Sequence, residues 1–375
     1  MLASERNNPI LWVSAAEASG DMHGAKLIDY LSQQAPSIEY RGMGGSEMRK
    51  TVFQAEINAE QLSVMGFTEV FEFLPHILKL FKKIKQRLKI LKPSAVILID
   101  SPDFHFHIAK MANKLEIPVY YYISPQVWAW RKGRVRFLRK YVHKMLCIVP
   151  FEEPFFQKHG VKASFVGHPL QDDLQEFKSR AVEKKTLALL PGSREKEVKS
   201  LMPYFAHAAS ILASYDPQIS FKLIKASQIP EKTILDLWPQ QLPLKIFPSS
   251  ERYTQISTCQ FAIAASGTVT LEASLLGVPT IVTYKLSSVS HLLGRLLIKV
   301  SFISMPNLIL NGKVLPEYIQ NEVTGTNLAN QIIYWLQNPA ELDKIRHNLT
   351  RLEDKLGPPG ATQRAGDIIL NGLNL

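Results

Sequence analysis

The chain has 375 residues, 46% hydrophobic and 21% charged, which suits two globular domains and excludes a disordered protein. Its formal net charge of +11 indicates an anionic partner: nucleic acid, a phosphorylated substrate or an anionic membrane surface. Cys147 and Cys259 lie in apolar runs without metal-ligand spacing, which favours reduced core residues of a cytosolic protein. No apolar run approaches the ~20 residues that span a bilayer and no signal peptide is apparent, so we expect a soluble or peripheral protein.

The first predicted elements are a strand from Ile10 to Ala16, a turn of small residues and a helix that ends near Leu31. A turn of this kind presents backbone N–H groups to an anion. It also places Glu17 and Ser19 at the carboxyl edge of the predicted sheet, together with Asp21. On this segment alone, an ordinary βα turn with helix caps is an equally good interpretation.

The segment from Leu62 to Lys92 is apolar at first and then carries seven Lys and Arg from Lys79 onward without an acid. An apolar helix bordered by lysines suits insertion into the face of an anionic bilayer. The alternative is an amphipathic helix that packs on the sheet with a solvated basic face. The side chains expected to contact membrane or acyl chains are Val70, Phe71, Phe73, Leu74, Ile77 and Leu78.

The apolar run Val96 to Ile99 predicts a strand buried on both faces, as in a parallel sheet. This strand ends on two acids, Asp100 and Asp103, with Pro102 between them. Because ligands bind beyond the carboxyl ends of strands in open α/β sheets, a carboxylate here suits a general base. The alternative is that Asp100 or Asp103 only caps the helix that follows, although two acids at one strand end favour chemistry.

Two tryptophans follow the next predicted strand, in Ser124-Pro-Gln-Val-Trp-Ala-Trp. They are interpreted either as core anchors or as the lining of an acyl or sugar pocket. The stretch from Arg131 to Lys144 has seven Lys and Arg and no acid, which predicts a phosphate-facing, membrane-facing or simply solvated surface. The charged segment from Gln171 to Lys185 has the composition of a linker.

The second half repeats the order of strand, turn and helix. Pro191-Gly-Ser-Arg follows a predicted strand and opens a helix, so Arg194 beside two small residues makes a candidate anion site. Another buried strand ends in Ser266-Gly-Thr, whose hydroxyls and amides suit a pyrophosphate, and Glu272 lies where a carboxylate can accept from ribose hydroxyls. The alternative is that Ser266-Gly-Thr only caps a helix and that Glu272 is a surface acid.

Taken in order, these motifs resemble the lipid-A-disaccharide synthase family over nearly the whole chain. Ile-Asp-x-Pro-Asp-Phe at 99–104 and Ser-Pro-x-Val-Trp-Ala-Trp at 124–130 are specific to that family, whereas Ser-Gly-Thr…Glu is shared more widely by GT-B glycosyltransferases. One departure is Ala16, where the family usually has Gly before Glu17, and its methyl group is expected to narrow the first turn. The segments that carry the resemblance are 17–21, 99–104, 124–130, 191–194, 266–272 and 306–308.

The resemblance implies an α/β protein with the GT-B fold, in which two Rossmann-like domains with parallel sheets face each other across a cleft. We expect an N-terminal domain at 1–170, on the acceptor and membrane side, and a C-terminal domain at 171–345, on the UDP-sugar side. Residues 346–375 are expected to form a helical tail that packs back or is exchanged in a homodimer.

The reaction implied by the resemblance is an inverting transfer that joins UDP-2,3-diacylglucosamine to 2,3-diacylglucosamine 1-phosphate (lipid X). Its products are a β(1→6) lipid A disaccharide 1-phosphate and UDP. The family uses no metal ion or other cofactor, and it works at the anionic cytoplasmic face of the inner membrane of Gram-negative bacteria as a peripheral hexosyltransferase. No nucleic-acid partner is expected, because acidic clusters follow two of the strands.

An inverting transfer needs a base for the acceptor hydroxyl and positive or dipolar groups for departing UDP. Asp100 is the expected base, because it directly ends its strand, and Asp103 is the reserve. The full catalytic set is Asp100, Asp103, Glu17 and Ser19. The nucleotide-binding set is Arg194, Ser266, Gly267 and Thr268 for the diphosphate, Glu272 for the ribose, and Asn307, which like Glu17 and Ser19 matches the family without a derived role.

Two other classes of function stay open on the sequence. One is a different GT-B activity, such as a nucleotide-sugar epimerase or a cell-wall GlcNAc transferase, which gives no reason for the tryptophan motif or the apolar-basic helix. The other is a non-catalytic protein that binds membranes or nucleic acid, which the net charge alone suggests.

Overall fold

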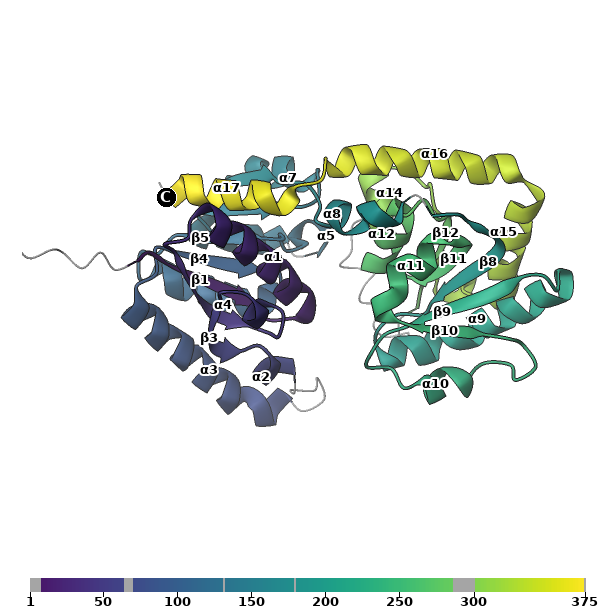
Figure 1. Ribbon diagram of the computed structural model, residues 1–375, viewed down its shortest axis with the longest axis horizontal. Helices are drawn as coiled ribbons and strands as arrows, with labels where there is room; N and C mark the ends of the chain where they lie inside the picture. The colour runs from purple at the N-terminus through teal and green to yellow at the C-terminus, as the bar shows by residue number, and fades with distance from the viewer. Residues whose placement is uncertain (1–7, 64–69, 131, 179, 286–300, 374–375) are drawn as a thin grey trace, which may run out of the picture. The chain divides into compact units, whose positions relative to one another are not determined.

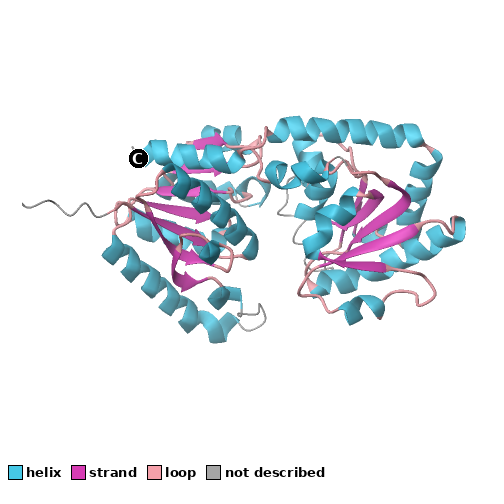
Figure 2. Cartoon of the chain, viewed as in Figure 1, coloured by secondary structure: helices cyan, strands magenta, loops and turns pink. Residues whose placement is uncertain are grey.

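The computed structural model describes residues 8–63, 70–130, 132–178, 180–285 and 301–373. The chain forms two compact units: unit 1 is Met1–Pro169 with Pro359–Leu375, and unit 2 is Leu170–Pro358 (Figure 1). Each unit is an α/β structure built on a parallel sheet (Figure 2), as the sequence predicts. The chain therefore enters unit 2 once and returns to unit 1 for its last helix.

Within the described residues, unit 1 has a 7-stranded sheet in the order β3-β2-β1-β4-β5-β6-β7, and all neighbouring strands are parallel. The chain builds outward from β1 in one direction and then from β4 in the other. The boundary between β1 and β4 is therefore the topological switch point, where ligands bind in such sheets. The strands are β1 (Ile10–Ala15), β2 (Glu39–Gly44), β3 (Gln54–Asn58), β4 (Ala95–Ile99), β5 (Val119–Tyr122), β6 (Lys144–Cys147) and β7 (Ala163–Phe165).

Helices cover both faces of this sheet. The buried side chains of α1 and α17 belong to one apolar cluster, and those of α3, α4, α6 and α7 belong to the cluster on the opposite face. The helices are α1 (Ala18–Gln34), η1 (Met48–Lys50), α2 (Glu60–Ser63), α3 (Val70–Leu91), α4 (Pro102–Asn113), α5 (Val127–Trp130), η2 (Lys132–Arg134), α6 (Val135–Tyr141), α7 (Glu152–Lys158) and α17 (Ala361–Leu373).

The second half of α3 is an amphipathic helix on the sheet, which was the alternative interpretation of that segment. Leu80, Ile84 and Leu88 recur every four residues and are buried, while the lysines between them are exposed. Ile77 is half-buried and Leu78 is 59% exposed. The other side chains predicted to contact the membrane lie outside the described side chains; they are Val70, Phe71, Phe73 and Leu74.

Unit 2 has, within the described residues, a 6-stranded sheet in the order β10-β9-β8-β11-β12-β13, again with parallel neighbours. Its switch point lies between β8 and β11. The strands are β8 (Glu183–Leu190), β9 (Ser220–Lys225), β10 (Lys245–Pro248), β11 (Cys259–Ala265), β12 (Thr280–Tyr284) and β13 (Glu317–Ile319).

The helices of unit 2 include α9 and α15, whose buried residues share one apolar cluster with the sheet, where Trp335 of α15 stacks on Phe261 of β11. They are α8 (Leu170–Leu174), η3 (Gln175–Phe177), α9 (Glu195–Tyr215), α10 (Glu231–Leu235), η4 (Ser249–Glu251), α11 (Arg252–Ser257), α12 (Thr268–Leu275), α14 (Met305–Leu310), η5 (Gln320–Glu322), α15 (Gly325–Gln337) and α16 (Pro339–Leu356).

The segment from Gln171 to Lys185 differs from the predicted linker. It forms α8, η3 and the start of β8, with Leu170 and Leu174 buried. Gln171 Nε2 donates to the Glu353 carbonyl (2.9 Å), and Lys178 Nζ pairs with the Glu353 carboxylate (2.9 Å). Charged composition alone misidentified the segment, because it does not show that Lys178 pairs with a helix far along the chain.

The last helix, α17, packs on α1 within unit 1. A Cβ atom added at Gly366 would lie 2.5 Å from the Tyr30 ring, so glycine is what lets the two helices approach. The Tyr30 hydroxyl donates to Asp367 Oδ1 (2.5 Å), and Arg364 Nε donates to the Val166 carbonyl (2.8 Å).

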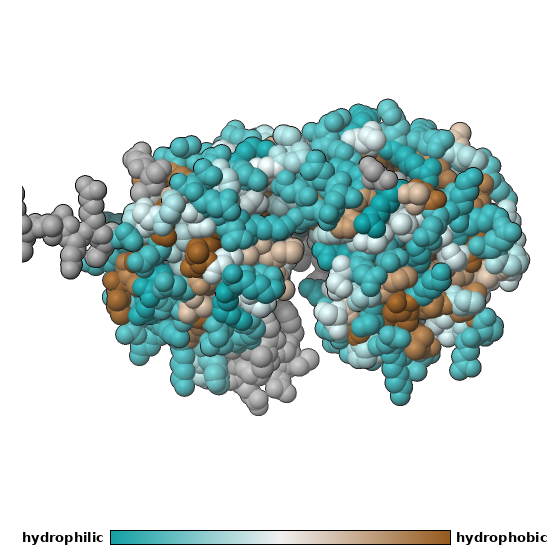
Figure 3. Space-filling view, in the orientation of Figure 1, coloured by the Kyte–Doolittle hydropathy of each residue, from teal (hydrophilic) through white to brown (hydrophobic). Residues whose placement is uncertain are grey.

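The surface in view in Figure 3 is mostly hydrophilic, with hydrophobic residues in small groups. Among the described helices, none is both long enough and apolar enough to cross a membrane.

Candidate active site

The switch point of unit 1 brings Glu17 and Asp100 together. Ala15 and Ile99 are register partners on β1 and β4, so the residues that follow them leave the sheet side by side. A Cβ atom at Gly20 would lie 3.3 Å from the Ile99 carbonyl oxygen, which shows how closely the start of α1 packs on the end of β4. The predicted proximity of the two acids is therefore a consequence of strand register.

The backbone turns sharply at Asp100. Asp100 and Ser101 have φ values of 52° and 45°, in the left-handed region that non-glycine residues rarely occupy. Hydrogen bonds hold this turn: the Asp100 N–H donates to the Tyr122 carbonyl (3.1 Å), and the Asp100 carbonyl accepts from the Tyr121 hydroxyl (2.7 Å). Pro102 then begins α4 at a position where a proline fits.

His105 is a second support for this turn, and the sequence interpretation missed it. Its side chain is fully buried, its Nδ1 donates to the Asp100 carbonyl (2.7 Å), and its Nε2 accepts from the Ser14 hydroxyl (3.1 Å). Burial lowers the pKa of His105 to about 4, so the imidazole is neutral at pH 7. The sequence signal that could have identified His105 is its position one turn into the helix that follows Asp100.

Burial raises the pKa of the Asp100 carboxyl, the Ser101 amide partly opposes this, and the neighbouring Glu17 charge adds to it. A carboxylate with raised proton affinity at a ligand-binding edge is suited to accept a proton from a substrate hydroxyl. Asp103 differs: its side chain is 74% exposed and pairs with Arg134 at 2.5 Å. Of the two acids at this strand end, Asp100 is therefore the one whose surroundings raise its proton affinity.

The other polar residues that the sequence predicts at this edge, Glu17, Ser19 and Asp21, differ in exposure. Glu17 and Ser19 are exposed at the start of α1. Asp21 is buried and accepts from the backbone N–H groups of Gly45 (2.6 Å) and Glu47 (2.8 Å), so it holds the loop after β2. Asp21 thus has a structural role.

The tryptophan motif is anchored by a buried acid that the sequence did not reveal. Glu152, at the start of α7, accepts from the Ser124 hydroxyl (2.5 Å), Trp128 Nε1 (3.0 Å) and the Val149 N–H (3.2 Å). Burial raises the pKa of Glu152 to about 7, although these three donors favour its charged form. Trp128 is therefore fixed near the carboxyl end of β5, on the same sheet edge as Asp100.

In unit 2, two loops meet at the switch point between β8 and β11, where Leu190 and Ala264 are register partners. One loop leads to Arg194, an exposed residue at the start of α9. In the other, Gly267 and Thr268 are exposed at the start of α12, while the Ser266 hydroxyl donates to the Ile303 carbonyl (3.1 Å). The sheet thus brings together the predicted diphosphate-binding residues.

A carboxylate already lies at the start of α9. Glu197 Oε2 accepts from the Ser193 N–H (3.2 Å), and burial raises the pKa of Glu197. A phosphate that used this amide would have to displace the Glu197 side chain, a competition that the sequence pattern does not predict.

Glu272 is not a surface acid, because only 6% of it is exposed. Its Oε1 accepts from Arg252 Nε (3.3 Å) and from the Tyr253 hydroxyl (3.3 Å), two partners that sequence reasoning missed. Burial raises the pKa of Glu272, and the Arg252 charge opposes this shift.

Asn307 is completely buried and bonded within the protein. Its Nδ2 donates to the Leu315 carbonyl (2.8 Å) and Glu317 Oε1 (2.9 Å), and its Oδ1 accepts from the N–H groups of Val314 and Leu315. Glu317 also accepts from the Ser304 hydroxyl (2.7 Å). In this conformation Asn307 holds the chain around α14 and has no surface for a nucleotide.

The model of the lipid-A-disaccharide synthetase family matches residues 11–369. A lipid-A-disaccharide synthase from Syntrophus aciditrophicus (strain SB) is 40% identical over 379 residues, which cover 97% of this chain and 98% of that protein. The corresponding synthase from Nitrosococcus oceani is 38% identical and covers 99% of each chain. The chain belongs to the lipid-A-disaccharide synthase family.

Membership in the lipid-A-disaccharide synthase family makes the protein a glycosyltransferase, as its motifs predict. A solved glycosyltransferase, the glycotransferase of kitacinnamycin, has a TM-score of 0.65 and 14% identity, covering 98% of this chain and 100% of that one. At this identity the likeness shows the fold alone, and it confirms the predicted GT-B class of two parallel-sheet α/β domains.

Proposed function

We propose that the protein joins UDP-2,3-diacylglucosamine to 2,3-diacylglucosamine 1-phosphate by an inverting transfer. The observation that carries this proposal is the half-buried carboxylate of Asp100, with its raised pKa, at the unit 1 switch point, in a chain of the lipid-A-disaccharide synthase family. The acceptor 6-oxygen bonds to the anomeric carbon, the bond from that carbon to the UDP oxygen breaks, and Asp100 takes the hydroxyl proton.

The role of unit 2 in this proposal is to bind UDP. Arg194, with the Ser266, Gly267 and Thr268 loop, balances the charge of the leaving diphosphate, and the exposure of Arg194, Gly267 and Thr268 supports this role. Glu272 accepts from the ribose hydroxyls while Arg252 and Tyr253 keep it oriented. Asn307 has an indirect role in UDP binding, because its side chain holds Glu317 and, through it, the chain around Ser304.

In unit 1, Glu17 and Ser19 are assigned to the acceptor sugar, because both are exposed at the start of α1 and the Glu17 charge acts on Asp100. Trp128, fixed by Glu152, is assigned to the acyl or sugar wall of the same edge. The enzyme is assigned to the cytoplasmic face of the inner membrane, where lipid substrates lie, and to a homodimer in which α17 is exchanged.

The reaction is tested by incubating the purified chain with both diacylglucosamine substrates, measuring UDP release and separating the lipid products by chromatography. We expect UDP and a disaccharide phosphate in equal amounts. UDP without disaccharide would indicate hydrolysis, and the absence of both would exclude these substrates.

The base is tested by Asp100→Asn, with Asp103→Asn as the matched variant. Loss of the base is expected to lower kcat by about 10²–10⁴-fold while UDP still binds, since proton transfer by a positioned group contributes that much. Asp103→Asn should change kcat much less, because Asp103 is exposed and paired with Arg134. Near-wild-type turnover of Asp100→Asn would exclude Asp100 as the base.

A further inference from the structure

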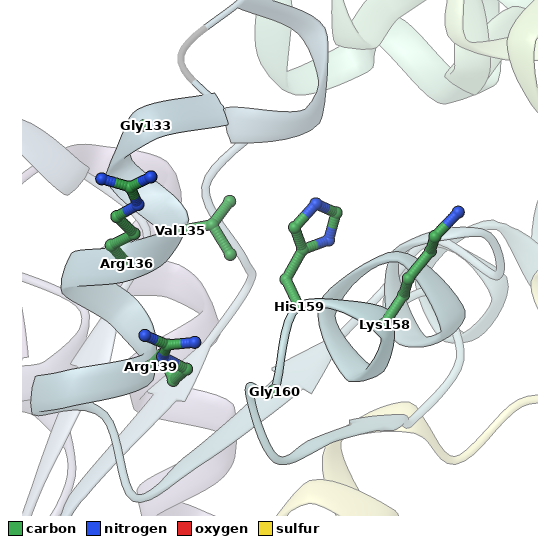
Figure 4. A pocket seen from close by; sticks show the side chains of 7 residues that line it. All are labelled: Gly133, Val135, Arg136, Arg139, Lys158, His159 and Gly160. Atoms are coloured by element: carbon green, nitrogen blue, oxygen red, sulfur yellow. The ribbon is translucent and has the colours of Figure 1, made fainter.

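A cavity of about 740 Å³ lies in unit 1 between α6 and the end of α7. We call it the basic cavity; its lining residues are Gly133, Val135, Arg136, Arg139, Lys158, His159 and Gly160. Figure 4 shows the two arginines on one wall, with His159 and Lys158 on the facing one. No acid is among the described residues that line it.

The cationic groups of the basic cavity are available to a ligand. Arg136, Arg139 and Lys158 are exposed, and none of them forms an ion pair with another described residue. His159 Nδ1 donates to the Phe155 carbonyl (2.7 Å), which leaves Nε2 for another partner. Gly160 has a φ of 75°, and a Cβ atom there would lie 3.1 Å from Arg139 Cδ, so a larger residue would crowd this wall.

Two cationic residues of the basic cavity lie away from the proposed transfer site, whereas Gly133 and Arg136 lie at the other end of α6, next to Arg134, which pairs with Asp103. Arg139 and Lys158 lie in the last turns of α6 and α7, which lead into the amino ends of β6 and β7. Asp100 follows the carboxyl end of β4. Since the strands are parallel, these positions belong to opposite edges of the sheet.

The cavity also belongs to a cationic helical layer. The described exposed residues of α3, α4, α6 and α7 include many Lys and Arg, and Asp103, an exposed acid on these helices, pairs with Arg134. The exposed cations of these helices are Lys79, Lys82, Lys83, Lys85, Lys89, Lys110, Arg136, Arg139, Lys140 and Lys158. Leu78 and Ile90, both 59% exposed, add apolar surface on α3. Charge of one sign with exposed apolar side chains is typical of a surface that contacts anionic lipid.

We propose that the basic cavity binds the phosphate group of an anionic phospholipid, and so fixes this helical layer on the membrane. Guanidinium groups bind phosphate oxygens with paired N–H donors. The cavity volume of about 740 Å³ lies in the range for drug-sized ligands, which suits a glycerophosphate headgroup better than a lone phosphate ion. The inference rests on the proposed membrane association.

The first experiment measures binding of the full chain to vesicles of phosphatidylcholine, with and without phosphatidylglycerol. Near an anionic surface each Lys or Arg contributes about fivefold to binding by diffuse attraction, so loss of a specific site in Arg136→Gln/Arg139→Gln should lower binding to the phosphatidylglycerol vesicles by more than about 25-fold. The matched control is Lys110→Gln/Lys114→Gln, which removes the same charge at and just after the end of α4 and should lower binding by about 25-fold or less. Equal losses in both variants would mean diffuse attraction and overturn the proposal.

The second experiment identifies the source of the phosphate. Dihexanoyl phosphatidylglycerol below its micelle concentration, glycerol 1-phosphate and inorganic phosphate are titrated calorimetrically into wild type and Arg136→Gln/Arg139→Gln. The expected result is that the short-chain lipid binds most tightly and that the variant loses this binding. If inorganic phosphate binds as tightly as the lipid, or if none of the three binds, the lipid assignment is overturned.

The third experiment separates this proposal from the proposed reaction. With substrates dispersed in detergent, Arg136→Gln/Arg139→Gln should keep wild-type UDP release, because neither arginine is among the residues assigned to the transfer and Arg139 lies at the opposite edge of the sheet from Asp100. A loss of turnover in the variant with unchanged vesicle binding would place the cavity in the acceptor site and overturn the proposal. If the wild type itself makes no disaccharide, the reaction assignment fails while the vesicle result still decides the cavity.

Discussion

Asp100 and His105 lie five residues apart, and burial moves their pKa values in opposite directions. For the acid, burial disfavours the anion and raises the pKa; for the imidazole, burial disfavours the cation and lowers it. The neutral state of His105 stabilises the backbone turn at Asp100, because a neutral imidazole can accept from the Ser14 hydroxyl while it donates to the Asp100 carbonyl. A charged imidazole carries a proton on both ring nitrogens and could not accept from the Ser14 hydroxyl.

His105 should make stability depend on pH. Its pKa in the folded state, about 4, is below the ordinary histidine value of 6.5, so the unfolded chain binds the proton first. The free energy of unfolding should therefore lose up to about 3 kcal/mol as the pH falls from 6.5 towards 4, and this contribution is fully present above 6.5. The measurement is urea unfolding at several pH values.

His105→Gln should flatten this part of the pH dependence, although the variant also has lower stability at pH 7. His107→Gln is the matched control, because it replaces an exposed histidine on the same helix. His168, buried with its pKa lowered to about 3, keeps its own contribution in both variants. An unchanged slope in His105→Gln would contradict a buried neutral imidazole.

At the scale of elements, α17 packs most closely on α1 at Gly366. Glycine is a poor residue for a helix interior, so a glycine inside α17 is explained by packing. The added Cβ at Gly366 would lie 2.5 Å and 2.7 Å from Tyr30 ring atoms and 3.3 Å from Leu31 Cδ2, so helix and ring cannot both stay in place.

Gly366→Val should lower the free energy of unfolding by about 2 kcal/mol, which is typical of overpacking. It should also raise amide hydrogen exchange in α17, because the helix moves off α1. Asn371→Val, on an exposed part of the same helix, is the matched control for helix propensity. If both variants lose the same stability, close packing at Gly366 is not the cause.

At the scale of the whole molecule, the net charge of +11 is unevenly placed. The described half of α3 has exposed lysines above a buried apolar stripe, and this half packs on the sheet. Membrane contact by α3 is therefore a prediction for its first half, where the apolar residues have no lysines among them.

Phe71→Ser/Phe73→Ser/Leu74→Ser should weaken binding of the protein to phosphatidylglycerol vesicles by at least about tenfold. The reason is that inserted apolar side chains add to the electrostatic attraction. The measurement is co-sedimentation. The matched control is Val182→Ser/Tyr215→Ser/Leu235→Ser, which removes three exposed apolar side chains of unit 2. Unchanged co-sedimentation of the first variant would refute insertion by α3.

The sequence by itself determined the α/β class, the buried strands that precede the candidate site residues, and the position of Asp100, Arg194 and Ser266 at strand ends. These features are local, because an apolar run and the residue that ends it define a buried strand and its carboxyl edge. The family also followed from local motifs at 99–104 and 124–130.

Tertiary structure decided which polar residues are partners. The contacts of Asp100 with Tyr121, of Trp128 with Glu152 and of Glu272 with Arg252 join residues about twenty positions apart, and no local periodicity encodes them. The return of α17 to unit 1, the burial of Asn307 and the grouping of cations around the basic cavity have the same cause. Burial and pKa depend on what packs around a group, which only the folded chain specifies.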